Sequence, residues 1–162
     1  GVIGKQLPTE PIEKGIGDAL KQLKDDHQAG IDVATSIMTT DTKPKHLAVE
    51  IEVGGKTVTI GACCKGSGMI HPNMATMLGF ITTDLNISKE LLNKALKSVI
   101  PDTFNMISVD RDTSTNDTVL LLANGLAGND EITEENEDYQ IFKEALSPFA
   151  GVTDTEIPFS VF

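Results

Sequence analysis

The chain has 162 residues, about the size of one ordinary domain, and its 13 Lys and Arg against 24 Asp and Glu give a net charge of −11. This acidic balance argues against nucleic-acid binding, which needs a basic face to displace counterions from phosphates, and against docking on an anionic membrane. The longest clean apolar run, residues 119–123, is far too short to span a bilayer. We therefore expect neither nucleic acid nor a membrane among the partners.

The two cysteines, Cys63 and Cys64, are adjacent, and neighbouring cysteines rarely form a disulfide because the geometry is strained. We expect a reducing, cytoplasmic compartment and interpret both as small, semi-apolar residues of a buried strand. The three histidines show no metal-type spacing to each other or to the cysteines, so we predict no metal site.

Residues 8–25 are predicted to form a helix that begins with Pro8 or Pro11 in its first turn and has one apolar face. That face comprises Ile12, Ile16, Ala19, Leu20 and Leu23. Residues 31–38 form a short apolar segment whose type the pattern leaves open, and residues 39–42 are typical of a polar loop.

Residues 46–61 alternate apolar and polar side chains on either side of Gly54-Gly55, which predicts a β-hairpin. The triplet Gly55-Lys56-Thr57 resembles part of a phosphate-binding loop. That motif needs another glycine at position 50, where this chain has Glu, so the hairpin is the better interpretation.

The second half predicts a helix over 88–99 capped by Ser88, a buried strand over 117–123 and an amphipathic segment over 137–149. The acidic run 131–138 is interpreted as a solvated loop and helix start. Helices together with a hairpin indicate a layered α/β domain, which we take as a single domain or fragment over 1–162.

The most unusual stretch runs from Lys65 to Leu78, where two glycines and Pro72 precede Thr76 and an apolar run. A threonine on a tight bend before a strand could serve as a nucleophile. The residues alone favour a plainer interpretation, in which Thr76 is a β-favouring residue at the start of a strand and no base is identifiable nearby.

This stretch resembles the self-cleavage site of the ornithine acetyltransferase family, the glutamate N-acetyltransferases of arginine biosynthesis. Other segments resemble elements of the same family in the same order, from Gly1 to about Ala150. They are Gly1 to Gly4, Ile37 to Thr42 with Pro44-Lys45, Phe104-Asn105, Ile107 to Asp110, Asp112 to Thr118 and Leu121 to Gly125. Several long motifs in the right order are far more specific than any single one.

The resemblance implies that the hydroxyl of Thr76 breaks the Ala75–Thr76 bond, giving pieces 1–75 and 76–162. The free α-amine of Thr76 then acts as a built-in general base. The resemblance further implies that the hydroxyl takes the acetyl group from N-acetylornithine and passes it to glutamate. Some members also accept acetyl-CoA as a donor, and no cofactor is implied.

Three further roles follow from the resemblance. Gly1 matches the glycine of a Thr-Gly pair whose groups stabilise the oxyanion, although the threonine would precede the first residue. Lys65 is expected to pair with the substrate α-carboxylate, and Thr39 to supply a hydroxyl hydrogen bond, with Thr40 as an alternative for that second role.

The implied fold is a layered αββα arrangement of the N-terminal-nucleophile type, here incomplete. We expect the chain to be the middle of the enzyme, because the family's region before Gly1 and its C-terminal half have no counterpart. After about Ala150 the pattern departs from the family, and only Glu156 could correspond to its substrate-binding glutamate. The expected partners are the small-molecule substrates, the second chain from cleavage and further copies in an oligomer.

Three alternatives stay open. The chain could be a non-catalytic relic or truncated module of the same fold, or a self-processing Thr amidase or aminopeptidase that uses water as acceptor. The segment from Ile107 to Thr113 resembles aspartyl-phosphate phosphotransferases, with Asp110 as nucleophile. Ser108 and Ser114 break the apolar pattern that this third interpretation needs.

Overall fold

The computed structural model describes residues 4–67, 77–102 and 116–151, with side chains up to 149. The chain divides into two compact units, one ending at residue 32 and the other beginning at residue 33. Within the described residues, no helix is both long and apolar enough to cross a membrane.

The first unit contains helix α1, Glu10–Leu20, and most of the predicted 8–25 helix is thereby confirmed. Pro11 lies in the first turn, where its missing N–H has no partner to lose. The apolar side chains Ile12, Ile16 and Leu20 are all exposed within the described chain.

Helix α2, His27–Ser36, settles the segment whose type the sequence left open. Asp26 precedes this helix, and its carboxylate accepts a hydrogen bond of 2.8 Å from the backbone N–H of Ala29. This is the N-terminal capping interaction that satisfies one of the otherwise unpaired donors of a first helical turn. The polar loop predicted for 39–42 follows the helix, as expected.

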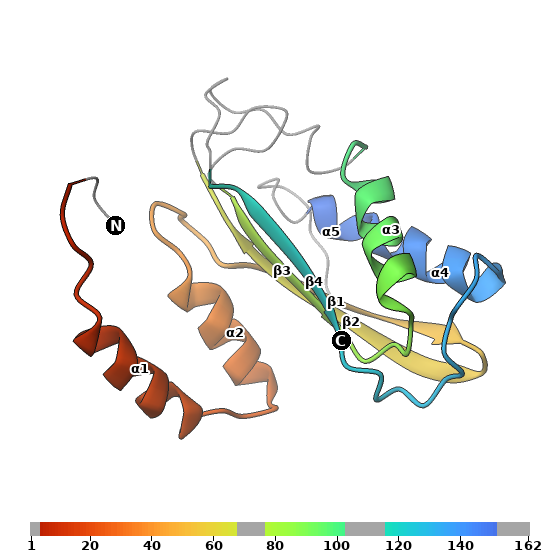
Figure 1. Ribbon diagram of the computed structural model, residues 1–162, viewed down its shortest axis with the longest axis horizontal. Coiled ribbons are helices and arrows are strands. Elements are labelled where there is room, and N and C mark those ends of the chain that lie inside the picture. The colour runs from red at the N-terminus through yellow and green to blue at the C-terminus, as the bar shows by residue number, and fades with distance from the viewer. Residues whose placement is uncertain (1–3, 68–76, 103–115, 152–162) are drawn as a thin grey trace. The chain divides into compact units, whose positions relative to one another are not determined.

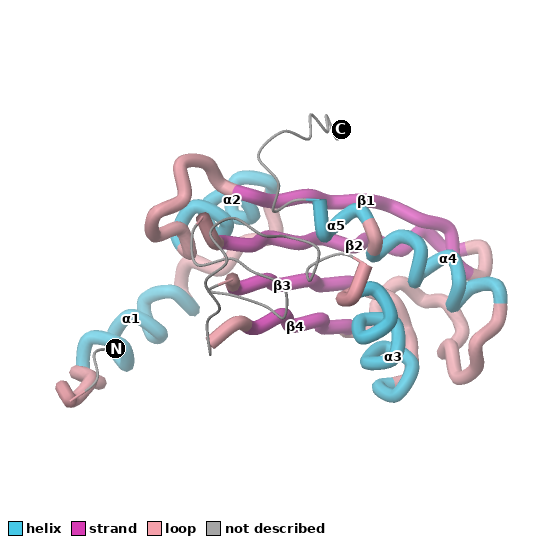
Figure 2. The backbone as a smooth tube through the Cα atoms, turned by 90° about the horizontal axis from the view of Figure 1, so that it is seen from above, coloured by secondary structure: helices cyan, strands magenta, loops and turns pink. Residues whose placement is uncertain are grey.

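Four strands form one sheet in the order β1-β2-β3-β4 (Figure 2). The strands are β1, Lys45–Val53, β2, Lys56–Lys65, β3, Leu78–Thr83, and β4, Thr118–Ala123. The first two pairings are antiparallel, whereas β3 and β4 are parallel. Parallel neighbours need a long crossover, and the segment between them contains a helix.

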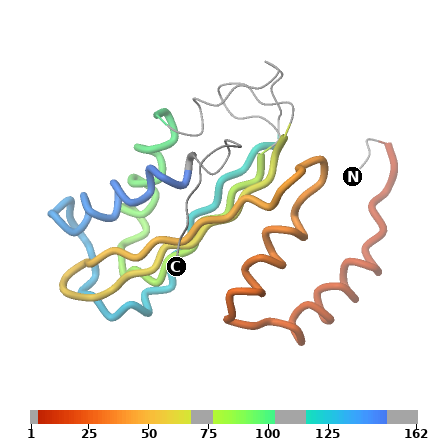
Figure 3. Tube along the Cα trace, turned by 180° about the vertical axis from the view of Figure 1, so that it is seen from behind, coloured from red at the N-terminus to blue at the C-terminus, as the bar shows by residue number. Residues whose placement is uncertain are grey.

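The predicted hairpin is confirmed, and its turn is Gly54-Gly55. Both glycines have positive φ, 55° and 70°, as a two-residue turn of this kind requires. The N–H of Gly54 donates to Asp138 Oδ1 at 3.1 Å, so the turn lies beside the start of helix α4, Glu137–Leu146 (Figure 3). The phosphate-loop interpretation of residues 55–57 is thereby excluded.

Helices α3, Lys89–Val99, and α4 lie on one side of the sheet, followed by the short α5, Pro148–Gly151 (Figure 1). The capping role predicted for Ser88 is confirmed, because its side chain accepts from the N–H of Leu91. The core between helices and sheet is aliphatic with a few aromatic rings. Its fully buried large side chains are Tyr139, Phe142, Phe149, Ile60, Ile81, Leu85, Leu146, Val53 and Val58.

The strand predicted for 117–123 exists as β4, but the expectation that it is buried is wrong. Val119 and Leu121 pack against the core, whereas Leu120 and Leu122 are 44% and 56% exposed. Successive side chains of a strand point to opposite faces, so a run of apolar residues can have only half of them on the helical side. The mixed α/β class is confirmed, and one sheet with one helical layer is consistent with an incomplete αββα arrangement.

Removing the ring of Phe142 should test the packing of α4 on the sheet. We expect Phe142→Ala to lower the free energy of unfolding by about 3–5 kcal/mol, because the ring is fully buried and its loss leaves a cavity. Denaturant unfolding followed by circular dichroism measures the change. The matched control is Leu126→Ala, at a side chain that is 80% exposed. Equal effects of the two substitutions would contradict this packing.

Candidate active site at one end of the sheet

The strand register brings four chain segments to the same end of the sheet. Lys45 at the start of β1 pairs with Cys64 near the end of β2. Lys65 pairs with Leu78 at the start of β3, and Leu78 pairs with Thr118 at the start of β4. The loop before β1, the end of β2 and the starts of β3 and β4 therefore meet here, and each contains a motif singled out in the sequence.

The structure places two of the predicted site residues. Lys65 is the last residue of β2 and is half-buried, and Thr39 lies in the loop between α2 and β1 with an exposed side chain. Gly1, Ala75 and Thr76 lie outside the described residues. Asp110 of the phosphotransferase interpretation and Glu156 do so as well.

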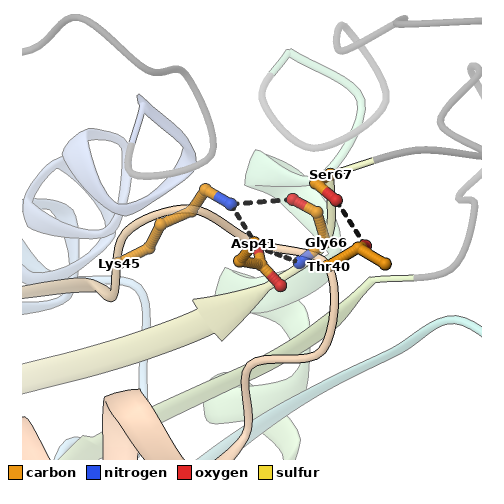
Figure 4. Close-up of polar contacts among 5 residues, drawn as sticks. All are labelled: Thr40, Asp41, Lys45, Gly66 and Ser67. Carbon is orange, nitrogen blue, oxygen red and sulfur yellow. Dashed lines mark hydrogen bonds and ion pairs between the residues drawn. The ribbon is translucent and has the colours of Figure 1, made fainter.

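A buried ion pair joins the loop before β1 to the end of β2 (Figure 4). Lys45 Nζ lies 2.5 Å from Asp41 Oδ1 and also donates to the carbonyl of Gly66 at 2.7 Å. The N–H of Gly66 donates to the same Asp41 oxygen at 2.9 Å. Both polar backbone groups of Gly66 are thus held, at a φ of 148° that glycine tolerates and other residues resist.

The Asp41 carboxylate is held in its charged form despite being buried. Burial alone would raise its pKa, but the ammonium of Lys45 and the backbone N–H groups of Gly66 and Thr39 lower the pKa below its usual value. Its side chain is 1% exposed, and Asp41 Oδ2 has no hydrogen-bond partner among the described residues.

The neighbouring hydroxyl of Thr40 lies 2.6 Å from that of Ser67, so these two side chains share a hydrogen bond (Figure 4). This contact gives Thr40 a partner within the chain. Thr39 and Thr40 are the two candidates for a substrate hydrogen bond, and the hydroxyl of Thr39 does not take part in this contact with Ser67.

A second carboxylate lies at the start of β4. Asp117 Oδ1 accepts from the N–H of Met77 at 2.6 Å, and the N–H of Thr118 donates to the carbonyl of Met77 at 3.0 Å. Burial raises the pKa of Asp117, and the Met77 N–H and the charge of Lys65 only partly offset this.

Sequence reasoning gave no role to Asp41, Lys45 or Asp117. The sequence contains one indication for Asp41 and Asp117, because each lies in a segment that resembles a family motif. Asp41 precedes β1 by a few residues, and Asp117 immediately precedes β4. However, an acidic and a basic residue four positions apart, such as Asp41 and Lys45, usually form a solvated surface pair. The order of residues along the chain does not reveal that the backbone of Gly66 hydrogen-bonds to both side chains.

The cysteines lie next to each other on β2, where Cys64 is buried and Cys63 is half-buried, and both are free. Burial raises the pKa of Cys64 to about 11 and raises that of Cys63, so neither is a ready thiolate nucleophile. In the part of the chain that the structure describes, no group of three His, Cys, Asp or Glu could hold a metal ion.

Asp41→Asn should be strongly destabilising, because it leaves the Lys45 ammonium without its counter-charge. We expect a loss of about 3–5 kcal/mol in the free energy of unfolding at neutral pH. Since the native pKa of Asp41 is lowered, its contribution is complete above the ordinary value of 3.8 and is lost as pH falls below it. Denaturant unfolding from neutral pH to below pH 3.8 measures both effects.

The matched control for this prediction is Asp18→Asn, because Asp18 forms an exposed pair with Lys21 at 3.4 Å. Such surface pairs add little to stability, so this variant should unfold like the parent chain. A parent-like stability of Asp41→Asn would show that the buried pair is dispensable.

Comparison with known proteins adds an independent finding. The ArgJ family profile matches residues 1–153. Arginine biosynthesis bifunctional protein ArgJ 1 of Clostridium acetobutylicum is 59% identical over 147 residues, covering 90% of this chain and 35% of that protein. Arginine biosynthesis bifunctional protein ArgJ of Symbiobacterium thermophilum is 54% identical over 147 residues, covering 91% of this chain and 36% of that protein.

A crystal structure of arginine biosynthesis bifunctional protein argJ from Bacillus halodurans is 48% identical, with a TM-score of 0.44, and covers 46% of this chain and 35% of that one. The chain spans little more than a third of the length of the curated relatives it matches. The profile match extends over nearly the whole chain and includes all of the motif segments that carried the family resemblance. The chain belongs to the ArgJ family.

Proposed function

We propose that this chain supplies the nucleophile of an acetyltransferase that moves the acetyl group of N-acetylornithine to glutamate. The observation that supports this most directly is the position of Met77, whose backbone N–H and carbonyl are both hydrogen-bonded at the sheet end that also carries Lys65. Thr76 directly precedes Met77 in the sequence, so the proposed nucleophile is one peptide bond from a fixed point.

Self-cleavage comes first in this proposal. The hydroxyl oxygen of Thr76 attacks the carbonyl carbon of Ala75, the C–N bond breaks and the Thr76 nitrogen takes the proton. Water then hydrolyses the resulting ester, which leaves a carboxylate on Ala75 and restores the hydroxyl of Thr76. The products are residues 1–75 and a second chain that begins with Thr76, and the two remain partners.

Acetyl transfer uses the same hydroxyl. The free α-amine of Thr76, with an ordinary pKa of about 7.7–8.0, removes the hydroxyl proton as the oxygen attacks the acetyl amide. The amine of ornithine leaves with a proton, and an acetyl ester remains on Thr76. The amine of glutamate then attacks this ester and leaves as N-acetylglutamate, which gives ping-pong kinetics.

The remaining groups bind the substrate and stabilise the oxyanion that forms during acyl transfer. Lys65 pairs with the α-carboxylate of the substrate, and Thr39 donates or accepts a hydroxyl hydrogen bond there. Gly1 contributes part of an oxyanion hole, in which one donor is typically worth about 2.7–4 kcal/mol. These three roles are supported by the family motifs. For Thr39 and Lys65 they are also supported by the hydrogen bond between the nearby residues Thr40 and Ser67, which brings the loop before β1 to the end of β2.

The reaction needs no cofactor, because both half-reactions are acyl transfers between amines and a hydroxyl. Acetyl-CoA is an additional acetyl donor to be tested, since its thioester can acylate the same hydroxyl. The proposed setting is the cytoplasm, and the assembly is an oligomer of the cleaved chains.

Substitution of Thr76 tests the proposed nucleophile. In the natural polypeptide that contains this chain, we expect Thr76→Ala to abolish both cleavage and acetyl transfer, and Thr76→Ser to retain both at a lower rate. Gel or mass analysis gives the fragment sizes, and N-acetylglutamate formation gives the transfer rate. Acetate release without glutamate would indicate the amidase alternative, and an intact, inactive parent protein would indicate the relic.

Substitution of Lys65 tests the carboxylate contact. We expect Lys65→Ala to raise the KM for N-acetylornithine roughly 10- to 150-fold with little change in kcat. The lost interaction is a charge-assisted hydrogen bond to the substrate carboxylate, which is equally strong in the bound substrate and in the transition state. Lys65→Arg should recover part of the affinity. Lys43→Ala, at an exposed lysine of the nearby loop, is the control. An unchanged KM in Lys65→Ala would exclude the contact.

A further inference from the structure

Met77 is the first residue that the structure describes after position 67, and it lies directly before β3. Asp117 and Thr118, two adjacent residues at the start of β4, hold its backbone N–H and its carbonyl. Asp117 lies in a motif that the sequence singled out, yet the proposed function gives it no task.

The hydrogen bond from the Met77 N–H to Asp117 also restrains the peptide unit that precedes Met77. A peptide unit is planar, so a hydrogen bond to its N–H orients the whole unit that joins Met77 to the residue before it. A carboxylate acceptor makes such a bond short and about twice as strong as a neutral acceptor would, and the distance here is 2.6 Å.

We propose that Asp117 is a positioning residue, whose carboxylate fixes the peptide unit after Thr76 and so sets the Thr76 hydroxyl for cleavage and transfer. This inference rests on the proposed function and deepens it. Asp117 acts through the backbone of Met77 and is given no contact with substrate.

The Asp117 carboxylate has one oxygen on the backbone of Met77. Oδ1 accepts from the Met77 N–H at 2.6 Å, whereas Oδ2 is buried without a hydrogen-bond partner among the described residues. The described hydrogen bond of this carboxylate is therefore made to the backbone group that the proposal has it position.

The sheet contains a matched control for this interaction. Asp84 Oδ1 accepts from the N–H of Thr59 at 2.8 Å, so a second aspartate also holds a strand backbone. Asp84 follows the end of β3, whereas Asp117 lies at the start of the neighbouring parallel strand. The two carboxylates make the same kind of bond at opposite ends of the sheet.

The test measures the self-cleavage rate, kcat and KM in the natural polypeptide that contains this chain. We expect Asp117→Ala to lower the cleavage rate and kcat about 100-fold with KM nearly unchanged, the scale of effect that a misplacement of about 1 Å produces. Asp117→Glu keeps the charge but displaces the acceptor, and should lower both rates at least about tenfold. Asp117→Asn keeps an acceptor oxygen in place and should retain most of the activity.

Asp84→Ala and Asp84→Glu should leave all three quantities near those of the parent. Parent-like rates in Asp117→Glu would overturn the proposal, and so would a loss in Asp117→Asn as large as that expected for Asp117→Ala. If Asp117→Ala does not fold, the Glu and Asn variants still decide between these results. Thr76→Ala in the same series separates the two claims. An inactive Thr76→Ala together with parent-like rates in Asp117→Glu removes the positioning role alone, whereas an active Thr76→Ala removes the proposed function and the positioning role with it.

Discussion

The hydrogen-bonded register of the four strands is the constraint on which the candidate site depends. Because Lys45 pairs with Cys64, Lys65 with Leu78 and Leu78 with Thr118, four segments distant in the sequence end or begin at one end of the sheet. A slip of one residue in any pair would move its side chains to the other face. The core side chains of α3 and α4 hold this register from one side of the sheet.

Two carboxylates, the buried Asp41 and the half-buried Asp117, each hold a backbone N–H at this end of the sheet. Asp41 accepts from the N–H of Gly66, which precedes the proposed cleavage site in the sequence. Asp117 accepts from the N–H of Met77, which follows that site. Their electrostatics differ, because Asp41 has the adjacent Lys45 ammonium and a lowered pKa, whereas burial dominates at Asp117 and raises its pKa. We assign Asp41 a role in the stability of the fold, and Asp117 a role in positioning the proposed nucleophile.

Local patterns in the sequence predicted much of the fold. The Gly54-Gly55 hairpin, the Ser88 cap and the amphipathic α4 each depend on neighbours within a few residues, and all three are found. The sequence pattern does not determine the type of the segment that forms helix α2, because its apolar residues are few and partly β-branched. The exposure of Leu120 and Leu122 depends on what covers each face of the sheet, which a single strand's sequence cannot reveal. The Asp41–Lys45–Gly66 contacts were missed for the same reason, since they depend on the tertiary approach of β2.

The central claim is that Thr76 carries the acetyl group, and trapping that intermediate tests it most directly. The natural polypeptide is incubated with N-acetylornithine in the absence of glutamate, quenched in acid and mapped by peptide mass spectrometry. The account predicts one added acetyl group on the peptide that begins with Thr76, which disappears when glutamate is supplied. An acetyl group on any other residue, or an unmodified Thr76 in a protein that still transfers acetyl groups, would contradict it.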